Sequence, residues 1–417
     1  MAGRNFLFVP GPTNVPERIQ RAMMVSMEDH RSPRFPQLTH AIMAGLRGIF
    51  RTQGGTPFVF PSSGTGCWEA ALTNTLSPGD KVLAASFGQF SYLWIDMCRR
   101  LGLDVQVVEC DWGTGVPLQQ YEDILKNDIH HEIKAVLVCH NETATGVTSD
   151  VAGVREALEE TQHPALLFVD CVSSLGCLDF RFDEWGVDMA VCGSQKGLML
   201  PAGLGILCAS PKALAAYPSS KLKRAYFDLQ DMQQSNAGGY FPYTPALTLM
   251  YGLLESIKMI NEEGLDNVIA RHHYLAEGVR AAVTQGWQLK LCAQEKRWHS
   301  DTVTAVMLPE GIAGTAVIAR AYQRYNLSLG GGLSKVAGKL FRIGHLGDMN
   351  EIHLMAAING AEMAMLDCGV QVQPGSAAAA AGHYWRTHEA PTGLCAMPST
   401  SASSVLQSKP ETPAVQV

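Results

Sequence analysis

The stretch Met189–Gly197, MAVCGSQKG, decides the fold that we predict for this chain. Its first four residues form a short apolar run, which is typical of a strand buried on both faces of a sheet. Lys196 follows between small residues, and a loop containing proline and glycine comes next. Open α/β sheets bind ligands outside the carboxyl ends of their strands, so we expect Lys196 to point into a ligand crevice.

Short apolar runs of the same kind recur through the first two-thirds of the chain and alternate with stretches of helical periodicity. Seven strands are predicted: Pro57–Phe60, Lys81–Ala85, Val105–Glu109, Ala135–Cys139, Ala165–Asp170, Met189–Cys192 and Gly205–Ala209. Helices are predicted between them at Thr65–Leu76, Gln89–Leu101 and Val151–Glu160. This alternation indicates the α/β class, with a mostly parallel seven-stranded sheet covered by helices on both faces.

A smaller second domain is predicted after the long helical pattern Leu247–Asn261. Helices predominate from about Gly264, with short strands at Thr302–Leu308 and Leu340–Ile343. We expect an N-terminal arm (1–20), a large domain (21–263), a small C-terminal α+β domain (264–386) and a tail (387–417). The tail is rich in Ala, Ser, Pro and Thr without apolar periodicity, so we expect it to be disordered.

The composition of the 417-residue chain restricts its function. Hydrophobic residues make up 47% and charged residues 17%, with a formal net charge of -7, as in a globular protein that does not bind nucleic acid. No apolar run approaches the roughly 20 residues of a membrane-spanning helix. The 11 cysteines form no CxxC pair, and we predict no metal site. We also expect no secretory signal and no transit peptide, and the C-terminus PAVQV is not an SKL-type peroxisomal signal.

Asp170 ends the apolar strand ALLFVD, 26 residues before Lys196. Taken alone, the aspartate is as well explained as a helix cap, and a single lysine is most often solvated. Together they match the needs of a pyridoxal ring. The lysine binds the cofactor covalently, and the carboxylate keeps the ring nitrogen protonated, which makes the ring an electron sink.

Three further segments carry polar residues where strands end. Ser62–Gly66 joins a strand to a helix, where backbone N–H groups attract phosphate, although an ordinary Ser/Thr cap explains the segment better when it is taken in isolation. The segment 140–146, HNETATG, follows another strand and forms a polar turn. Arg342 lies inside the apolar run FRIG and needs an anion, either an internal carboxylate or that of an amino-acid substrate.

In this order, these residues resemble the class V aminotransferases of fold type I, and within them the serine–glyoxylate and alanine–glyoxylate aminotransferases. The resemblance runs from about Leu7 to Gly382. Its motifs are FVPGPTNVP (8–16), HRSP (30–33), FPSSGTGCWEAALTNTLSPGD (60–80), HNETATGV (140–147), FRFDEWGVD (180–188), GSQKG (193–197) and FRIGHLG (341–347). The serine branch is favoured, because the alanine branch tends to have tryptophan where this chain has Phe90.

The resemblance implies a role for each matching residue within one chain. Lys196 would be the Schiff-base lysine and proton shuttle, and Asp170 the partner of the pyridine nitrogen of pyridoxal 5′-phosphate. Thr143 would hydrogen-bond the cofactor's oxygen, Phe90 would stack on its ring, and Arg342 would bind the substrate carboxylate. The cofactor phosphate would be held by Ser63, Gly64, Thr65 and Gln195.

The resemblance also implies a homodimer with shared active sites. Tyr243 and Thr244 would reach the phosphate of the neighbouring subunit, and His30 and Arg31 would line the partner's substrate site. A plant-like serine-branch member tends to have tyrosine at the position of His30, which leaves the amino donor open.

The implied reaction moves an amino group from L-serine, or also L-alanine, to glyoxylate, in photorespiratory glyoxylate metabolism and in a peroxisome. Aspartate–glyoxylate transamination is the alternative, because Arg31 could bind a side-chain carboxylate. A cysteine desulfurase would need a cysteine in the loop Leu329–Lys339, which has none. A catalytically silent dimeric scaffold is the alternative of another class, and it predicts the loss of Lys196, Asp170 or Arg342.

Overall fold

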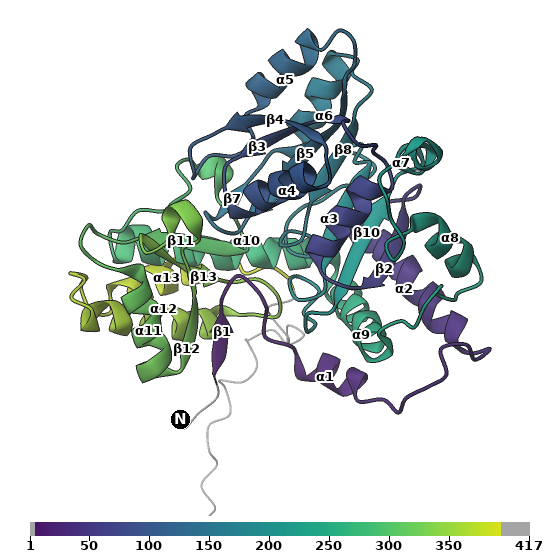
Figure 1. The fold of residues 1–417 in the computed structure, drawn as a ribbon. Helices are drawn as coiled ribbons and strands as arrows, with labels where there is room; N and C mark the ends of the chain where they lie inside the picture. Colours follow the sequence, from purple (N-terminus) through teal and green to yellow (C-terminus); the bar gives the residue numbers. More distant parts are fainter. Residues whose placement is uncertain (1–4, 393–417) are drawn as a thin grey trace, which may run out of the picture.

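The computed structural model describes residues 5–392, which form a large α/β part and a smaller α+β part (Figure 1). The large part is built on a seven-stranded sheet with the order β2-β10-β9-β8-β5-β3-β4. Its strands are β2 (Thr56–Pro61), β3 (Lys81–Ser86), β4 (Asp104–Glu109), β5 (Ile133–Cys139), β8 (Leu166–Asp170), β9 (Met189–Gly193) and β10 (Leu204–Ala209). All seven predicted strands are therefore confirmed.

The sheet is mostly parallel, as predicted. Strands β4, β3, β5, β8 and β9 pair in parallel, and only β10 runs antiparallel to both of its neighbours, β9 and β2. The carboxyl ends of β5, β8 and β9 consequently lie at one edge of the sheet. Cys139 pairs with Asp170 there, and Asp170 pairs with Val191.

Helices cover both faces of this sheet (Figure 1). Alternate strand residues enter two different cores, as the two-residue period of a strand requires: Val136 and Val138 pack in one, Ala135 and Leu137 in the other. The first core also receives α2 (Phe35–Phe50), α5 (Leu118–Asn127), α6 (Val151–Glu160) and α9 (Leu247–Glu263). The second receives α3 (Gly64–Thr73), α4 (Gln89–Arg100), α7 (Pro211–Ala216) and α8 (Leu229–Ala237).

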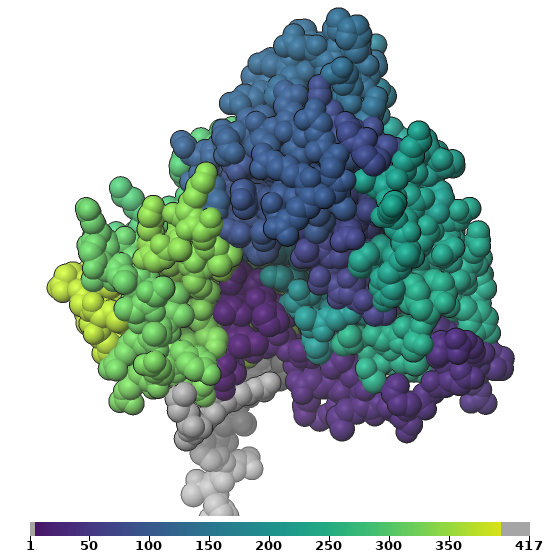
Figure 2. Space-filling model, viewed as in Figure 1, coloured from purple at the N-terminus to yellow at the C-terminus, as the bar shows by residue number. Residues whose placement is uncertain are grey.

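The smaller part is a four-stranded sheet with the order β1-β12-β13-β11. Its elements are β1 (Phe6–Phe8), β11 (Val303–Met307), β12 (Leu327–Gly331), β13 (Leu340–Gly344), α10 (Leu265–Ala281), α11 (Gly314–Tyr325), α12 (Glu351–Asp367) and α13 (Ser376–Thr387). Strand β1 pairs in parallel with β12, so the start of the chain joins the sheet of its C-terminal part. The chain then returns to the large part through α1 (Glu17–Met23), and Figure 2 shows this N-terminal segment at the surface between the two parts.

Some local predictions were wrong. Strand β4 is the edge of the sheet, and its ends, Asp104 and Glu109, are exposed, whereas we expected burial on both faces. Helix α3 ends at Thr73 rather than Leu76. The predicted disordered tail (387–417) lies outside the described residues from 393 onward. Within residues 5–392, no helix is both long and apolar enough to span a membrane.

Candidate functional site

A cavity lies at the carboxyl edge of the large sheet and contains eight of the predicted site residues. Each lining residue comes from a segment that follows a strand or begins a helix, where parallel strands bring distant parts of the chain together. The lining residues are Ser63, Gly64, Thr65, Trp68, Phe90, Asn141, Thr143, Asp170, Val172, Ser173, Gln195 and Lys196.

Lys196 is largely buried at this edge, directly after β9. Its Nζ donates to the carbonyl oxygen of Pro10 at 2.5 Å. The pKa of Lys196 is lowered to about 8, mainly by burial and also by the positive charge of Arg342, whereas Asp170 opposes the shift. An amine with such a pKa is partly neutral near pH 7, as covalent attachment to a carbonyl compound and proton transfer both require.

Asp170 is a buried carboxylate (5% exposed) that pairs with no cationic side chain within 4 Å among residues 5–392. Its Oδ1 accepts the backbone N–H of Val172 at 2.8 Å. The pKa of Asp170 is raised to about 7, mainly by burial, while the Val172 N–H and the Lys196 charge oppose the shift. A buried carboxylate without a cation is destabilised, so this position suits a ligand that brings a protonated nitrogen.

The turn from β2 into α3 forms an anion cradle that also lines the cavity. Ser63 caps the helix, its Oγ accepting Gly66 N–H at 3.4 Å. A Cβ at Gly64 would lie 2.4 Å from Val172 Cγ2, so only glycine lets the helix start this close to β8. Gln195 Oε1 is buried without a hydrogen-bond partner among the described residues, so this acceptor is available to a donor group of a ligand. The free N–H groups of the first turn attract a phosphate.

Arg342 lies on β13, next to Thr143, and is buried (6% exposed). It donates to two backbone carbonyl oxygens, that of Gly331 at 2.8 Å and that of Thr143 at 2.7 Å. Burial lowers the pKa of Arg342 to about 10, and the charge of Glu142 raises it. In the described part of the chain, no carboxylate lies within 4 Å of the Arg342 guanidinium. The Arg342 guanidinium therefore has no internal carboxylate as an ion-pair partner, and a ligand carboxylate could pair with it.

The other predicted site residues do not line this cavity. Arg31 is exposed in the segment between α1 and α2, and the nearby His30 Nε2 is buried without a hydrogen-bond partner among residues 5–392. Tyr243 stacks on Tyr226 at a ring distance of 4.3 Å, and Thr244 is exposed. Within one chain, these residues therefore stand apart from Lys196.

The N-terminal segment closes over Lys196, a contact that the sequence did not predict. A Cβ at Gly11 would lie 2.3 Å from Lys196 Nζ, and Gly11 has a φ of +113°, which favours glycine. Thr13 N–H donates to the carbonyl oxygen of Gln195 at 3.1 Å. The motif FVPGPT was visible in the sequence, but contacts made by backbone atoms leave no side-chain pattern. Trp68 was missed as well, because an aromatic residue on a buried helix face is ordinary core.

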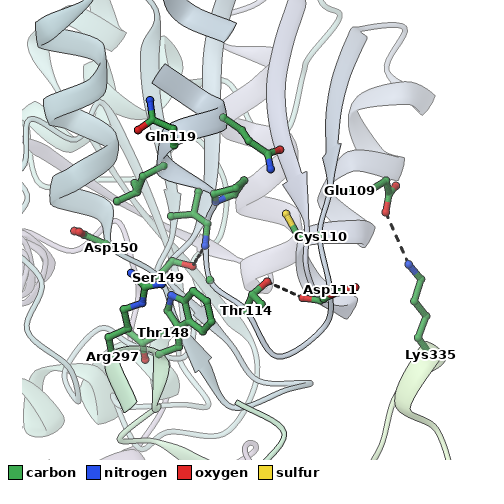
Figure 3. Close-up of a pocket in the computed structure, with 16 residues that line it drawn as sticks. Glu109, Cys110, Asp111, Thr114, Gln119, Thr148, Ser149, Asp150, Arg297 and Lys335 are labelled. Carbon is green, nitrogen blue, oxygen red and sulfur yellow. Dashed lines mark hydrogen bonds and ion pairs between the residues drawn. The ribbon is translucent and has the colours of Figure 1, made fainter. Parts of the chain in front are cut away.

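A larger cavity than this one lies between the large and small parts, with a volume of about 1100 Å³. Figure 3 shows Glu109 of β4 facing Lys335 of the small part at one side of it, and their charged groups are 3.8 Å apart. Both side chains are well exposed, and an ion pair of this kind stabilises little. None of the predicted site residues lines this cavity, so its size does not make it the reactive centre.

Comparisons with known proteins agree with the geometry. The family model described as aminotransferase class-V matches residues 6–334. The chain is 58% identical to a serine–glyoxylate aminotransferase from Methylorubrum extorquens, over 92% of this chain and 96% of that protein. It is 52% identical to an L-aspartate–glyoxylate aminotransferase from Paracoccus denitrificans, over 93% and 97%. The solved structure of an alanine–glyoxylate aminotransferase from Nostoc sp. matches with a TM-score of 0.79 and 31% identity, over 88% and 96%.

Proposed function

Because the chain belongs to the class V aminotransferases, which use pyridoxal 5′-phosphate, we propose that it transfers the amino group of L-serine to glyoxylate. The products would be hydroxypyruvate and glycine, with L-alanine a second donor that would give pyruvate. The observation that carries this proposal is the 58% identity to a serine–glyoxylate aminotransferase over nearly the whole of both chains. The substrates of an aminotransferase are small amino and oxo acids, and the buried Arg342, which contacts the cavity residue Thr143, fits their carboxylate.

The lining residues fit the cofactor. When bound, pyridoxal phosphate carries the amino group between donor and acceptor and withdraws electrons from the carbon that loses its proton. Asp170 would hold the proton on the ring nitrogen. Burial raises the pKa of Asp170, and a positively charged ring nitrogen beside it would stabilise the ionised carboxylate. Ser63, Gly64, Thr65 and Gln195 would hold the phosphate.

The remaining groups of this chain would orient and protonate the substrate. Arg342 would bind the α-carboxylate through its guanidinium, which the Gly331 and Thr143 carbonyl oxygens hold in place. Lys196 Nζ would accept the proton from the substrate Cα and deliver it to the C4′ carbon of the cofactor, a task that suits a pKa near 8. Phe90 would pack on the cofactor ring, and Thr143 would hydrogen-bond its oxygen.

We further propose that the active unit is a homodimer. His30, Arg31, Tyr243 and Thr244 lie away from the cavity of their own chain, as residues that complete a partner's site would. Mixing a Lys196→Ala chain with a Thr244→Ala chain tests this. If sites are shared, re-formed mixed dimers hold one intact site and one site with both defects, so mixing restores activity to the intact site. Mixtures no more active than the separate variants would contradict shared sites.

A panel of amino donors tests the substrate assignment. Purified enzyme is assayed with L-serine, L-alanine and L-aspartate, each against glyoxylate and 2-oxoglutarate, with detection of both products. We expect L-serine and glyoxylate to give the highest kcat/KM. Transfer only to 2-oxoglutarate would contradict the assigned acceptor.

L-aspartate is the second candidate donor, because a relative of that activity is 52% identical to this chain. Its side-chain carboxylate would need a cation, and the exposed Arg31 of the partner would supply it. Arg31→Leu should then reduce aspartate turnover while sparing serine. The peroxisomal location implied by the resemblance is a further proposal, which imaging of the tagged full-length chain would test.

A further inference from the structure

Glu142 is a fully buried carboxylate (0% exposed) for which the proposed function has no role. It lies in the short hairpin of β6 (Asn141–Glu142) and β7 (Val147–Thr148) that follows β5. Its oxygens accept three backbone N–H groups: Oε2 those of Phe90 at 2.9 Å and Ser91 at 3.0 Å, and Oε1 that of Ala144 at 3.1 Å. Such bonds satisfy a buried charge, so the carboxylate is held in one position.

Two of these N–H groups belong to the first turn of α4. Helix α4 begins at Gln89, so Phe90 and Ser91 are its second and third residues, whose N–H groups an N-cap side chain ordinarily accepts. The N-cap residue here is Gly88, which has no side chain. Glu142, 52 positions beyond Phe90, takes over that task and places a negative charge at the helix N-terminus, where it is favourable.

The geometry of Gly88 supports this interpretation. Its φ of -174° is extended backbone that any residue adopts, so conformation does not require glycine. A Cβ at Gly88 would instead lie 2.1 Å from Glu142 Cγ and 2.2 Å from Cδ. The missing side chain at position 88 is therefore the space that the Glu142 side chain occupies.

Glu142 also adjoins two parts of the proposed cofactor and substrate site. Phe90 lines the cavity from the first turn of α4, and Thr143, the next residue after Glu142, lines it from the hairpin. The Thr143 carbonyl oxygen accepts Arg342 Nη1 at 2.7 Å. A shift of the Glu142 side chain would consequently be transmitted first to Phe90.

We propose that Glu142 is a positioning residue that acts as a remote N-cap of α4 and thereby holds Phe90 against the cofactor ring. This inference rests on the proposed role of Phe90. It does not depend on which amino acid is the donor, so its test can fail while the donor panel succeeds, and the reverse.

Reciprocal variants at positions 142 and 88 test the proposal. Glu142→Ala removes the remote cap, and Gly88→Asp introduces a local cap that collides with the Glu142 side chain. The double variant Gly88→Asp/Glu142→Ala has a local cap and the space for it. The measurement is the dissociation constant of pyridoxal phosphate for the cofactor-free chain, together with the visible circular dichroism of the bound cofactor.

We expect each single variant to bind pyridoxal phosphate about tenfold more weakly and with a diminished dichroic signal, and the double variant to recover most of both. In a Phe90→Ala background, Glu142→Ala should add less than about threefold, because the two residues act in series. Glu362→Ala is the matched control. Glu362 is another buried carboxylate that accepts a backbone N–H, from Gly375 in the small domain, and its loss should lower stability but leave cofactor affinity unchanged.

Two results would overturn the proposal: wild-type cofactor affinity in Glu142→Ala, or a double variant that binds no better than either single variant. If Glu142→Ala does not fold, the comparison of Gly88→Asp with the double variant still tests the proposal. The double variant must then bind the cofactor more tightly than Gly88→Asp does, and equal affinities reject the remote cap.

Discussion

Replacing Asp170 by alanine should remove the charge that holds the cofactor's ring nitrogen protonated. Asp170 lies at the end of β8 and is 5% exposed. Burial raises its pKa from 3.8 to about 7 in the cofactor-free chain. Converted to free energy, that difference means that the ionised carboxylate is destabilised by about 4 kcal/mol when no cation lies beside it.

A protonated ring nitrogen supplies the missing cation, so a similar energy couples Asp170 to the proton on that nitrogen. Asp170→Ala loses this coupling, and we expect kcat to fall by up to about a thousandfold. Retention of the cofactor should change less, because Lys196 and the cradle at α3 remain.

A cofactor analogue makes the assay specific. N-methylated pyridoxal phosphate carries a fixed positive charge on the ring nitrogen, and alanine at position 170 leaves room for the methyl group. Steady-state kcat is measured for Asp170→Ala reconstituted with either cofactor. The analogue should raise kcat of the variant by at least about tenfold. In the wild-type enzyme, where the methyl group meets the Asp170 carboxylate, it should not raise kcat.

A variant with nearly wild-type kcat on the normal cofactor would refute this reasoning. So would a variant that binds the analogue, as its absorbance shows, without gaining activity. Either result would mean that the charge of Asp170 is not what sustains the reaction.

Three further predictions concern Lys196, Arg342 and the cofactor-free state. Lys196→Ala should abolish turnover and the visible absorbance of covalently held cofactor while the unfolding temperature changes little; measurable transamination would reject the assignment. Arg342→Lys should lower kcat/KM by about 10- to 100-fold, mainly through KM, because the bidentate grip on the carboxylate is lost; an unchanged KM for L-serine would contradict it. Because folding raises the pKa of Asp170 from 3.8 to about 7, the cofactor-free chain should lose stability relative to the Asp170→Asn variant as pH rises through that range, a trend that calorimetry would detect. Parallel stability curves for the two chains would show that Asp170 does not titrate in this range.

The α/β architecture and the groups at its carboxyl edge follow from the order of residues along the chain. Strands such as Met189–Gly193 are local apolar runs, and parallel pairing brings their ends together whatever the details of packing. For the same reason, the residues directly after those strands, Asp170 and Lys196 among them, were predictable from their positions along the chain. Asp170 and Lys196 line one cavity together with Ser63, Thr143 and Gln195.

The distant groups that support that cavity are known only from the packing of the elements in three dimensions. Glu142 caps α4 from the short strand β6, and the Pro10 carbonyl oxygen accepts a hydrogen bond from Lys196 Nζ. Neither contact is marked by a periodic pattern in the sequence. Both depend on long-range packing: one joins a side chain to backbone N–H groups 52 positions away, the other involves a residue 186 positions away. Patterns along a chain report which face of an element is buried, whereas the partner it meets is set by how the elements pack in space.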